Sequence, residues 1–275
     1  FKKFNVKLFK AEKINTHGGS LRIYVSKNKG IKIDTSINKI MKEEVYSLQS
    51  AADSSVTERA GVIRRTYLHV AGAIAAFALL EVFIFSSGYD VKLAEMMLGS
   101  QYSWLIVLGL FMGVSFIADK FAHSQTSEGM QYFGLGLFVV AEAVIFVPIL
   151  YIANEFFPGA IATSGYITAL LVIGLTSTVF ITKKDFSFMG NFLKIAFLVA
   201  FGVIVCSFIF GFTLGLLFSG AMALLAAGAV LYTTSNILHQ YHPGQHVAAA
   251  LALFSSIALL FWYVLQIVMS MMGRD

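Results

Sequence analysis

Long apolar runs separated by short polar breaks make up the chain from Thr66 to its end. A helix that crosses the hydrocarbon core of a bilayer needs about 20 apolar residues. Seven runs reach or approach that length, and they lie at residues 67–87, 103–122, 131–153, 160–181, 193–211, 214–236 and 247–271. We therefore predict an all-α membrane protein in which residues 66–272 form a bundle of seven transmembrane helices.

The shortest break, "FGFTLG" at residues 210–215, separates the fifth run from the sixth. Such a short connection predicts a tight hairpin between two antiparallel helices. A water-soluble helical protein is excluded as an alternative, because no soluble fold of this size could cover seven helices that are apolar on every side.

Residues 1–45 have a different pattern. "VKLFKAEKI" and "SLRIYVSK" alternate between apolar and polar positions as strands do, and "NTHGGS" between them is typical of a turn. "DTSINKIMKEE" predicts a short helix capped by Asp34 or Thr35. We interpret residues 1–45 as a short soluble α/β segment and residues 46–65 as a cytoplasmic segment next to the membrane.

The composition agrees with a membrane protein. Charged residues make up only 13% of the chain, against about 25% in soluble domains, and the mean hydropathy is +0.77. The net charge of +5 comes mostly from the first 65 residues, which we interpret as a basic segment before a membrane body and not as a nucleic-acid surface. Cys206, the single cysteine, lies inside an apolar run, so we expect it to be a buried structural thiol.

The distribution of Lys and Arg predicts the orientation in the membrane, because cytoplasmic loops carry an excess of both. One side carries Arg59, Arg64, Arg65, Lys120, Lys183, Lys184 and Lys194. The other side carries only Lys92 and Arg274. The N-terminus should therefore be cytoplasmic. A last helix that re-enters without crossing stays open as an alternative, because the loop before it has histidines but no Lys or Arg.

Two carboxyl groups lie within the apolar runs. Glu142, about eleven residues into the third run, should lie near the middle of the membrane. A carboxylate there costs about 2–3 kcal/mol, so we expect Glu142 to be neutral or to face polar neighbours. It could hydrogen-bond between helices or belong to a path for ions or protons. Glu81 lies near the outer end of the first run, where we expect it to reach the interface.

Polar side chains also flank the loop before the last run. His239, His242 and His246 have a spacing seen among zinc ligands, but we expect pH-responsive histidines and no metal site. Thr233 and Asn236 are three residues apart and should share one face of the sixth helix. Ser255 and Ser256 interrupt the seventh run. Small polar residues at helix contacts are an ordinary packing device in membranes, which is the alternative to a functional role for them.

Three stretches together resemble the Bax inhibitor-1/YccA family, also called the transmembrane Bax inhibitor motif family. They are "IRRTYLHVAGAIAAF", "FITKKDFSFMGNFL" and "LYTTSNILHQYHPGQHVAAALALFSSIALLFWYVL". The resemblance covers about residues 50–275 and is closest to the bacterial branch. It implies a bundle in which six helices surround a central seventh. It also implies a pH-sensitive calcium leak and, in some bacterial members, modulation of a membrane-anchored AAA protease; eukaryotic members are linked to suppression of cell death.

Many members of this family carry two aspartates that share a proton, one in a "Tyr-Asp-Thr-Ser" motif and one in a "Leu-Tyr-x-Asp" motif. Here the two motifs read "YTTS" at residues 232–235 and "LFSS" at residues 253–256. Thr233 and Ser256 therefore stand at the aspartate positions. Two hydroxyls can hydrogen-bond to each other, but they do not titrate near neutral pH and cannot hold Ca²⁺ as carboxylates do.

Two functions of different classes follow for a bacterial inner-membrane protein. The first is a small-cation (calcium) leak, with Glu142 on the path and Thr233, Asn236 and Ser256 lining a cytoplasmic gate. The second is a non-conducting regulator of a membrane-anchored AAA protease or another membrane complex. We expect neither an enzyme nor a cofactor, because no set of intramembrane protease residues is present at depth.

The stretch "THGGSLRIYV" within residues 1–45 resembles the C-terminal strand pair of SAM-dependent sugar C-methyltransferases. No glycine-rich strand-turn-helix that could bind SAM precedes it. We therefore assign no activity to residues 1–45.

Overall fold

The computed structural model describes residues 7–14, 20–28, 30, 32, 34–37, 56–124, 127–242 and 244–273, and the chain divides into two compact units, Phe1–Ser54 and Ser55–Asp275. In the first unit, β1 (Lys7–Ile14) pairs antiparallel with β2 (Ser20–Ser26). Both predicted strands are therefore confirmed.

Asp34 caps the helical turn at residues 35–37, as the sequence predicted. The backbone N–H of Ser36 donates a hydrogen bond to Oδ1 of Asp34 at 2.7 Å. The pKa of Asp34 is lowered, first by the side-chain hydrogen bond of Ser36 and then by this backbone bond. The rest of the helix predicted here, residues 38–44, lies outside the described residues.

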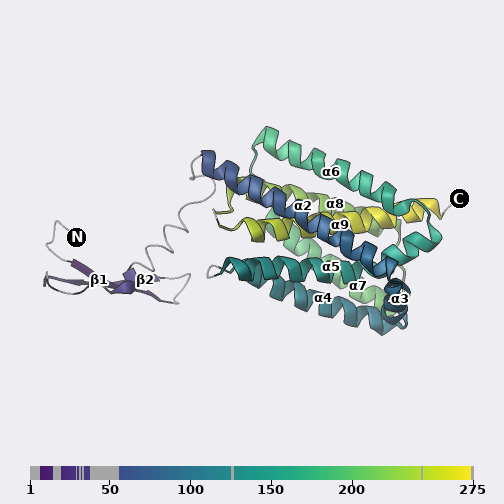
Figure 1. Ribbon diagram of the computed structural model, residues 1–275, viewed down its shortest axis with the longest axis horizontal. Coiled ribbons are helices and arrows are strands. Elements are labelled where there is room, and N and C mark those ends of the chain that lie inside the picture. The colour runs from purple at the N-terminus through teal and green to yellow at the C-terminus, as the bar shows by residue number, and fades with distance from the viewer. Residues whose placement is uncertain are drawn as a thin grey trace. The chain divides into compact units, whose positions relative to one another are not determined.

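The second unit is a bundle of long helices that run side by side (Figure 1). Seven helices of the described chain are long and apolar enough to cross a membrane, which confirms the predicted number. They are α2 (Val56–Ser86), α4 (Gln101–Ala122), α5 (Glu128–Phe156), α6 (Ala160–Thr182), α7 (Met189–Phe210), α8 (Leu216–His239) and α9 (His246–Met272). The fifth and sixth spans, α7 and α8, are joined by the predicted hairpin at residues 211–215, where Gly211 adopts the left-handed backbone conformation (φ 70°) that favours glycine.

Two boundaries differ from the sequence pattern. α2 begins at Val56, so residues 56–65 are the first turns of the helix that carries the first apolar run. The break after that run contains an additional short helix, α3 (Tyr89–Leu98), which packs against α5. Its buried residues Asp90, Ala94 and Met97 are three and four positions apart and line one side of the helix. The charged residues between them hide this stripe from a search for long apolar runs.

The last helix lies at the centre of the bundle, as the resemblance implied. α9 contacts α2, α4, α5, α6 and α8. In the most apolar window of α9 67% of the residues are buried, followed by 61% in α5 and at most 33% in the other spans. α9 is one unbroken helix of 27 residues that runs along the whole bundle (Figure 1), and this length and continuity favour a full crossing over a re-entrant last helix.

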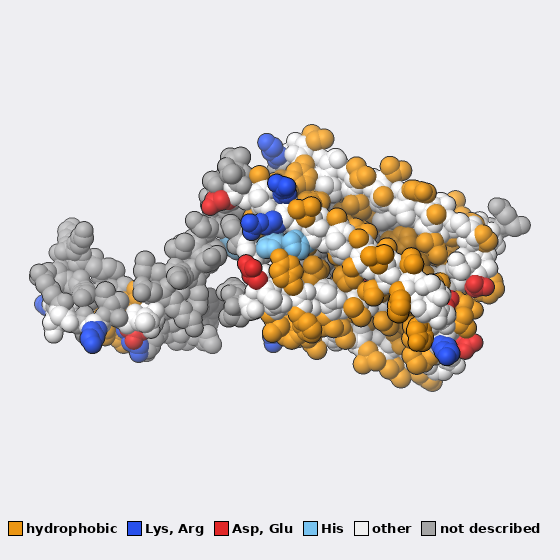
Figure 2. Space-filling model, viewed as in Figure 1, with side chains coloured by type: hydrophobic (Ala, Val, Ile, Leu, Met, Phe, Trp, Pro, Cys, Tyr) orange, Lys and Arg blue, Asp and Glu red, His pale blue; other side chains and the backbone are white. Residues whose placement is uncertain are grey.

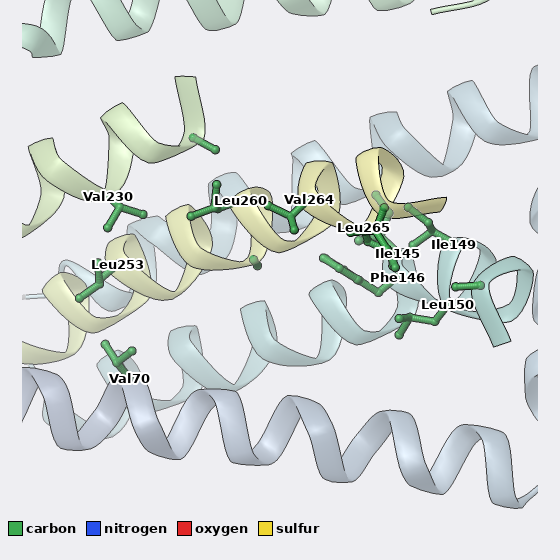
Figure 3. Close-up of a cluster of buried hydrophobic side chains, with 14 of the residues drawn as sticks. Val70, Ile145, Phe146, Ile149, Leu150, Val230, Leu253, Leu260, Val264 and Leu265 are labelled. Atoms are coloured by element: carbon green, nitrogen blue, oxygen red, sulfur yellow. The ribbon is translucent and has the colours of Figure 1, made fainter. Parts of the chain in front are cut away.

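Apolar side chains cover most of the face of the bundle drawn in Figure 2, while the interior is packed around α5, α8 and α9. Phe146 of α5 and Leu253, Leu260 and Leu265 of α9 belong to one buried cluster (Figure 3). Cys206 is exposed on α7, so the expectation of a buried thiol is wrong. An apolar exposed thiol is compatible with this position, because the surface of a spanning helix meets lipid and not water.

Candidate functional site

A cavity of about 830 Å³ lies among α4, α5, α7, α8 and α9. Residues 211–215 of the α7–α8 loop line it near one end of the bundle. Glu142 and Ser255 line it at greater depth, because both lie well inside their helices. The cavity therefore extends from the α7–α8 end of the bundle to about its middle.

Glu142 is the middle residue of α5, fourteen residues from either end of the helix, or about 21 Å at the rise of an α-helix. Glu142 is therefore as far as possible from both ends of its spanning helix, and its position in the middle of the membrane stays a prediction. The side chain is 5% exposed, and Glu142 is the only acidic or basic residue among the described residues that line the cavity. A carboxyl group at this depth needs a polar or charged partner in order to ionise, and the cavity is the space in which one can reach it.

Aromatic side chains form much of the cavity wall. The rings of Trp104 and Trp262 stack with centroids 6.0 Å apart and planes 19° apart. Phe146 meets Trp262 edge-on, with centroids 5.0 Å apart. A polar contact lies beside them: Ser219 Oγ donates to Oε1 of Gln266 at 2.8 Å. The wall therefore combines aromatic rings with neutral hydrogen-bonding groups.

The structure brings the hydroxyls of Thr233 and Ser256 together at 3.3 Å, between α8 and α9. Ser256 Oγ also donates to the carbonyl oxygen of Ala252 at 2.9 Å. A hydroxyl has a single proton, so Thr233 must be the donor to Ser256. Ser255, the preceding residue, lines the cavity instead. The two serines thus link the deep end of the cavity to the α8–α9 contact.

Asn236 lies one turn beyond Thr233 on α8 and is buried, 9% exposed. Its side-chain oxygen Oδ1 has no hydrogen-bond partner among the described residues. Asn236 is thus farther along α8 from the cavity-lining Ser219 than Thr233 is, and among the described residues its Oδ1 is not joined to the hydroxyl pair by a hydrogen bond.

Ser235 holds the α6–α7 loop against α8, a role that the sequence pattern did not reveal. Its hydroxyl oxygen accepts a hydrogen bond from the backbone N–H of Phe186 at 2.8 Å and donates to Oδ1 of Asp185 at 3.4 Å. The pKa of Asp185 is lowered, first by a backbone hydrogen bond from Ser187 and to a smaller extent by the nearby His239. The stretch "TKKDFSF" could have indicated a functional role for this loop, because it belongs to the most family-specific part of the sequence.

The three histidines flanking residue 243 have different partners. The His239 ring bonds through Nδ1 to the carbonyl oxygen of Ser235 at 3.0 Å. His246 is buried and packs on His69, with ring centroids 5.0 Å apart. The backbone N–H of His242 donates to Gln245 Oε1 at 3.1 Å. Within the described residues no three His, Cys, Asp or Glu side chains form a group that could hold a metal ion.

Glu81 does not reach the interface, so that expectation is wrong. The side chain is 7% exposed, and neither carboxyl oxygen has a hydrogen-bond partner among the described residues. Its position near the end of the apolar run predicted exposure, but the packing of α2 against the rest of the bundle covers it. Glu81 is not among the residues that line the cavity.

Seven helices long and apolar enough to span and a central last helix define a multi-pass membrane protein, in which a buried carboxyl group lines a cavity. The profile of the family described as "Inhibitor of apoptosis-promoting Bax1" matches residues 59–274. The chain belongs to this Bax inhibitor family.

Relatives in bacteria and eukaryotes match over most of their length. An uncharacterized protein of Pseudomonas aeruginosa is 29% identical over 82% of this chain and 96% of its own. Bax inhibitor 1 of Schizosaccharomyces pombe is 27% identical over 80% of this chain and 82% of its own. Protein LIFEGUARD 4 of Arabidopsis thaliana is 27% identical over 76% of this chain and 84% of its own. No solved structure matches the chain. The resemblance of residues 1–45 to a methyltransferase gains no support from these matches.

Proposed function

We propose that the protein is a small-cation leak of a bacterial inner membrane, with Ca²⁺ among its ions. One observation carries the proposal: the cavity ends at a buried carboxyl group in the middle of the bundle, Glu142. Burying an ionisable carboxyl group at this depth costs free energy, and such groups mark ion or proton pathways in membrane proteins.

The proposed path has two parts. A cation enters the cavity beside the α7–α8 loop and meets Glu142. It then passes the contact between Thr233 and Ser256, which separates the cavity from Asn236 and the opposite end of the bundle. Ca²⁺ takes six to eight oxygen ligands, so an ion that meets a single carboxylate keeps most of its water. Weak binding of this kind suits passage better than storage.

The gate in this proposal does not titrate. Two hydroxyls replace the aspartate pair of many relatives, and neither changes its charge near neutral pH. The leak should therefore be insensitive to pH at this contact.

The same hydroxyl pair favours a second candidate function, a non-conducting regulator of a membrane-anchored AAA protease or another membrane complex. A protein without the carboxylate pair has lost a means of attracting Ca²⁺ at the gate. In neither proposal does the protein act as an enzyme.

Calcium flux into liposomes tests the first proposal. The purified full chain is reconstituted, and uptake is followed with a trapped calcium dye between pH 6 and 8. We expect uptake above that of empty liposomes, and we expect Glu142→Gln to reduce it about tenfold or more, because the amide keeps the shape but loses the charge. Glu81→Gln is the matched control, because it removes another buried carboxyl group that does not line the cavity.

Two results would decide against the leak. Uptake equal to that of empty liposomes would favour the non-conducting regulator. Equal uptake by wild type and Glu142→Gln would show that the ions take another route.

A further inference from the structure

We propose that the cavity binds a small organic cation, an amine or quaternary ammonium compound, with Glu142 as its counter-ion. This inference rests on the proposed function, because it takes the cavity as the entrance of the same cation path. It adds a binding site and a class of ligand to that path.

The size and lining of the cavity favour an organic molecule. Pockets for small organic ligands measure about 300–1,000 Å³ and are mostly apolar with a few polar groups. This cavity measures about 830 Å³, and aromatic side chains from α4, α5, α7, α8 and α9 line it. Its volume is many times that of a single ion with a few water molecules, each of which occupies about 30 Å³.

The charge of the cavity favours a positive ligand. Glu142 is the only acidic or basic residue among its described lining residues, so no Lys or Arg there competes for the carboxylate. No hydrogen bond to the Glu142 carboxyl is present among the described residues. A buried charge is stable only with a partner, and a cationic ligand would supply one.

The rings supply the second part of the recognition. A cation over the face of an indole or phenyl ring is attracted by the electrons of the ring, and quaternary ammonium groups are often bound in this way. Trp104 and Trp262 stack at 6.0 Å, and Phe146, one helical turn from Glu142, meets Trp262 at 5.0 Å. The carboxyl group and the rings thus line one continuous space.

A tightly bound metal ion fits the cavity less well. Ca²⁺ needs six to eight oxygen ligands at about 2.3–2.6 Å. The described residues contain no group of three His, Cys, Asp or Glu side chains that could hold a metal ion. An organic cation needs only one carboxylate and the ring faces.

Intrinsic tryptophan fluorescence can report on binding at this site. Trp104 and Trp262 are its only two tryptophans, and both line the cavity. The full chain is placed in phosphatidylglycerol nanodiscs, whose headgroups carry no amine, and its tryptophan fluorescence is titrated with choline. The neutral analogue 3,3-dimethylbutanol, which has the same shape without the charge, is titrated in parallel.

We expect a saturable fluorescence change with choline and a response to 3,3-dimethylbutanol that is about tenfold weaker or absent. Glu142→Gln should weaken the choline response about tenfold or more, and Glu81→Gln should leave it unchanged. Equal responses of the wild type to choline and to its neutral analogue would overturn the proposal and would identify an apolar pocket. An unchanged affinity in Glu142→Gln would overturn it as well.

A trimethylammonium group can also come from a lipid headgroup. Replacing phosphatidylglycerol with phosphatidylcholine distinguishes the sources: a fluorescence change in phosphatidylcholine to which free choline adds nothing would support the chemistry of the site and identify the lipid as the ligand. Binding and flux are measured separately, so choline binding without calcium uptake would refute the leak alone, and calcium uptake without choline binding would refute this inference alone.

Discussion

The hydroxyl oxygens of Thr233 and Ser256 lie 3.3 Å apart, at the two positions where the family resemblance implies a pair of aspartates. The contact joins α8 to the central helix α9, and both residues are buried. Hydrogen bonds between membrane helices contribute about 0.6 kcal/mol on average. The contact is thus weak enough to open and, without a titrating group, its strength should not depend on pH.

The first prediction concerns the pair Thr233→Asp with Ser256→Asp. Two carboxyl groups at this separation cannot both ionise, so they should share one proton near neutral pH. The double variant should show a pH-dependent distance between α8 and α9, or a pH-dependent calcium leak, that the wild type lacks. Spin-label distances or liposome flux between pH 6 and 8 measure the difference.

Each single aspartate variant serves as a control and should be less stable than the double variant, because its carboxyl group has no partner carboxyl. The prediction would be contradicted by a wild type whose α8–α9 distance or calcium leak already changes between pH 6 and 8. The titrating group would then be sought at Glu142 or in the pair His69 and His246, whose ring centroids lie 5.0 Å apart.

A second prediction concerns the packing of α4 against α5. A Cβ atom on Gly134 would lie 2.6 Å from the carbonyl oxygen of Ala118 and 2.6 Å from the backbone nitrogen of Ala122. Backbone atoms cannot move aside as a flexible side chain can, so Gly134→Ala should lower the free energy of unfolding by about 1–3 kcal/mol. Thermal unfolding in detergent measures the effect.

Gly136→Ala is the matched control, because a Cβ atom there meets nothing within 4 Å. Both substitutions add the same methyl group to the same helix, so helix propensity changes equally in the two variants. Equal midpoints for Gly134→Ala and wild type would show that α4 and α5 are not packed as closely as described.

A third prediction concerns His123 at the end of α4. Its Nδ1 lies 3.3 Å from Oδ1 of Asp119, and the pKa of His123 is raised, first by the side-chain hydrogen bond with Asp119. The stabilisation from this pair should therefore be complete below the unfolded value of about 6.5 and disappear as pH rises through the folded pKa. The pair is largely exposed, so it contributes only about 0.3–0.5 kcal/mol.

Histidine-labelled NMR titration checks this directly. Asp119→Asn should move the pKa of His123 back toward 6.5. Glu155→Gln, at the opposite end of α5, should leave the titration unchanged. The same pKa for His123 in wild type and in Asp119→Asn would contradict the prediction.

A fourth prediction concerns orientation. In Figure 2, Lys and Arg side chains gather at the end of the bundle where α2 begins, and this end should face the cytoplasm. Reporter fusions after Lys194 should read cytoplasmic, and fusions after Tyr89 should read external. The reverse pattern would overturn the charge argument and place the mouth of the cavity on the cytoplasmic side.

Features that depend on position along one helix could be predicted from the sequence. The seven spans follow from hydropathy, because the bilayer demands a minimum apolar length whatever the neighbours are. The mid-membrane depth of Glu142 follows from counting residues along α5. The placement of Thr233 opposite Ser256 followed from the family motifs, and the structure brings the two hydroxyls together.

Features that depend on contacts between helices could be decided only by the tertiary structure. Ser255 and Ser256 are neighbours in the sequence, yet one lines the cavity and the other contacts α8, because successive residues of a helix point about 100° apart. Glu81 became buried, and Trp104 met Trp262, through the packing of helices that are distant in the sequence. In a bundle whose helices are apolar almost all round, hydropathy alone does not distinguish the side that meets lipid from the side that meets another helix, and only packing does.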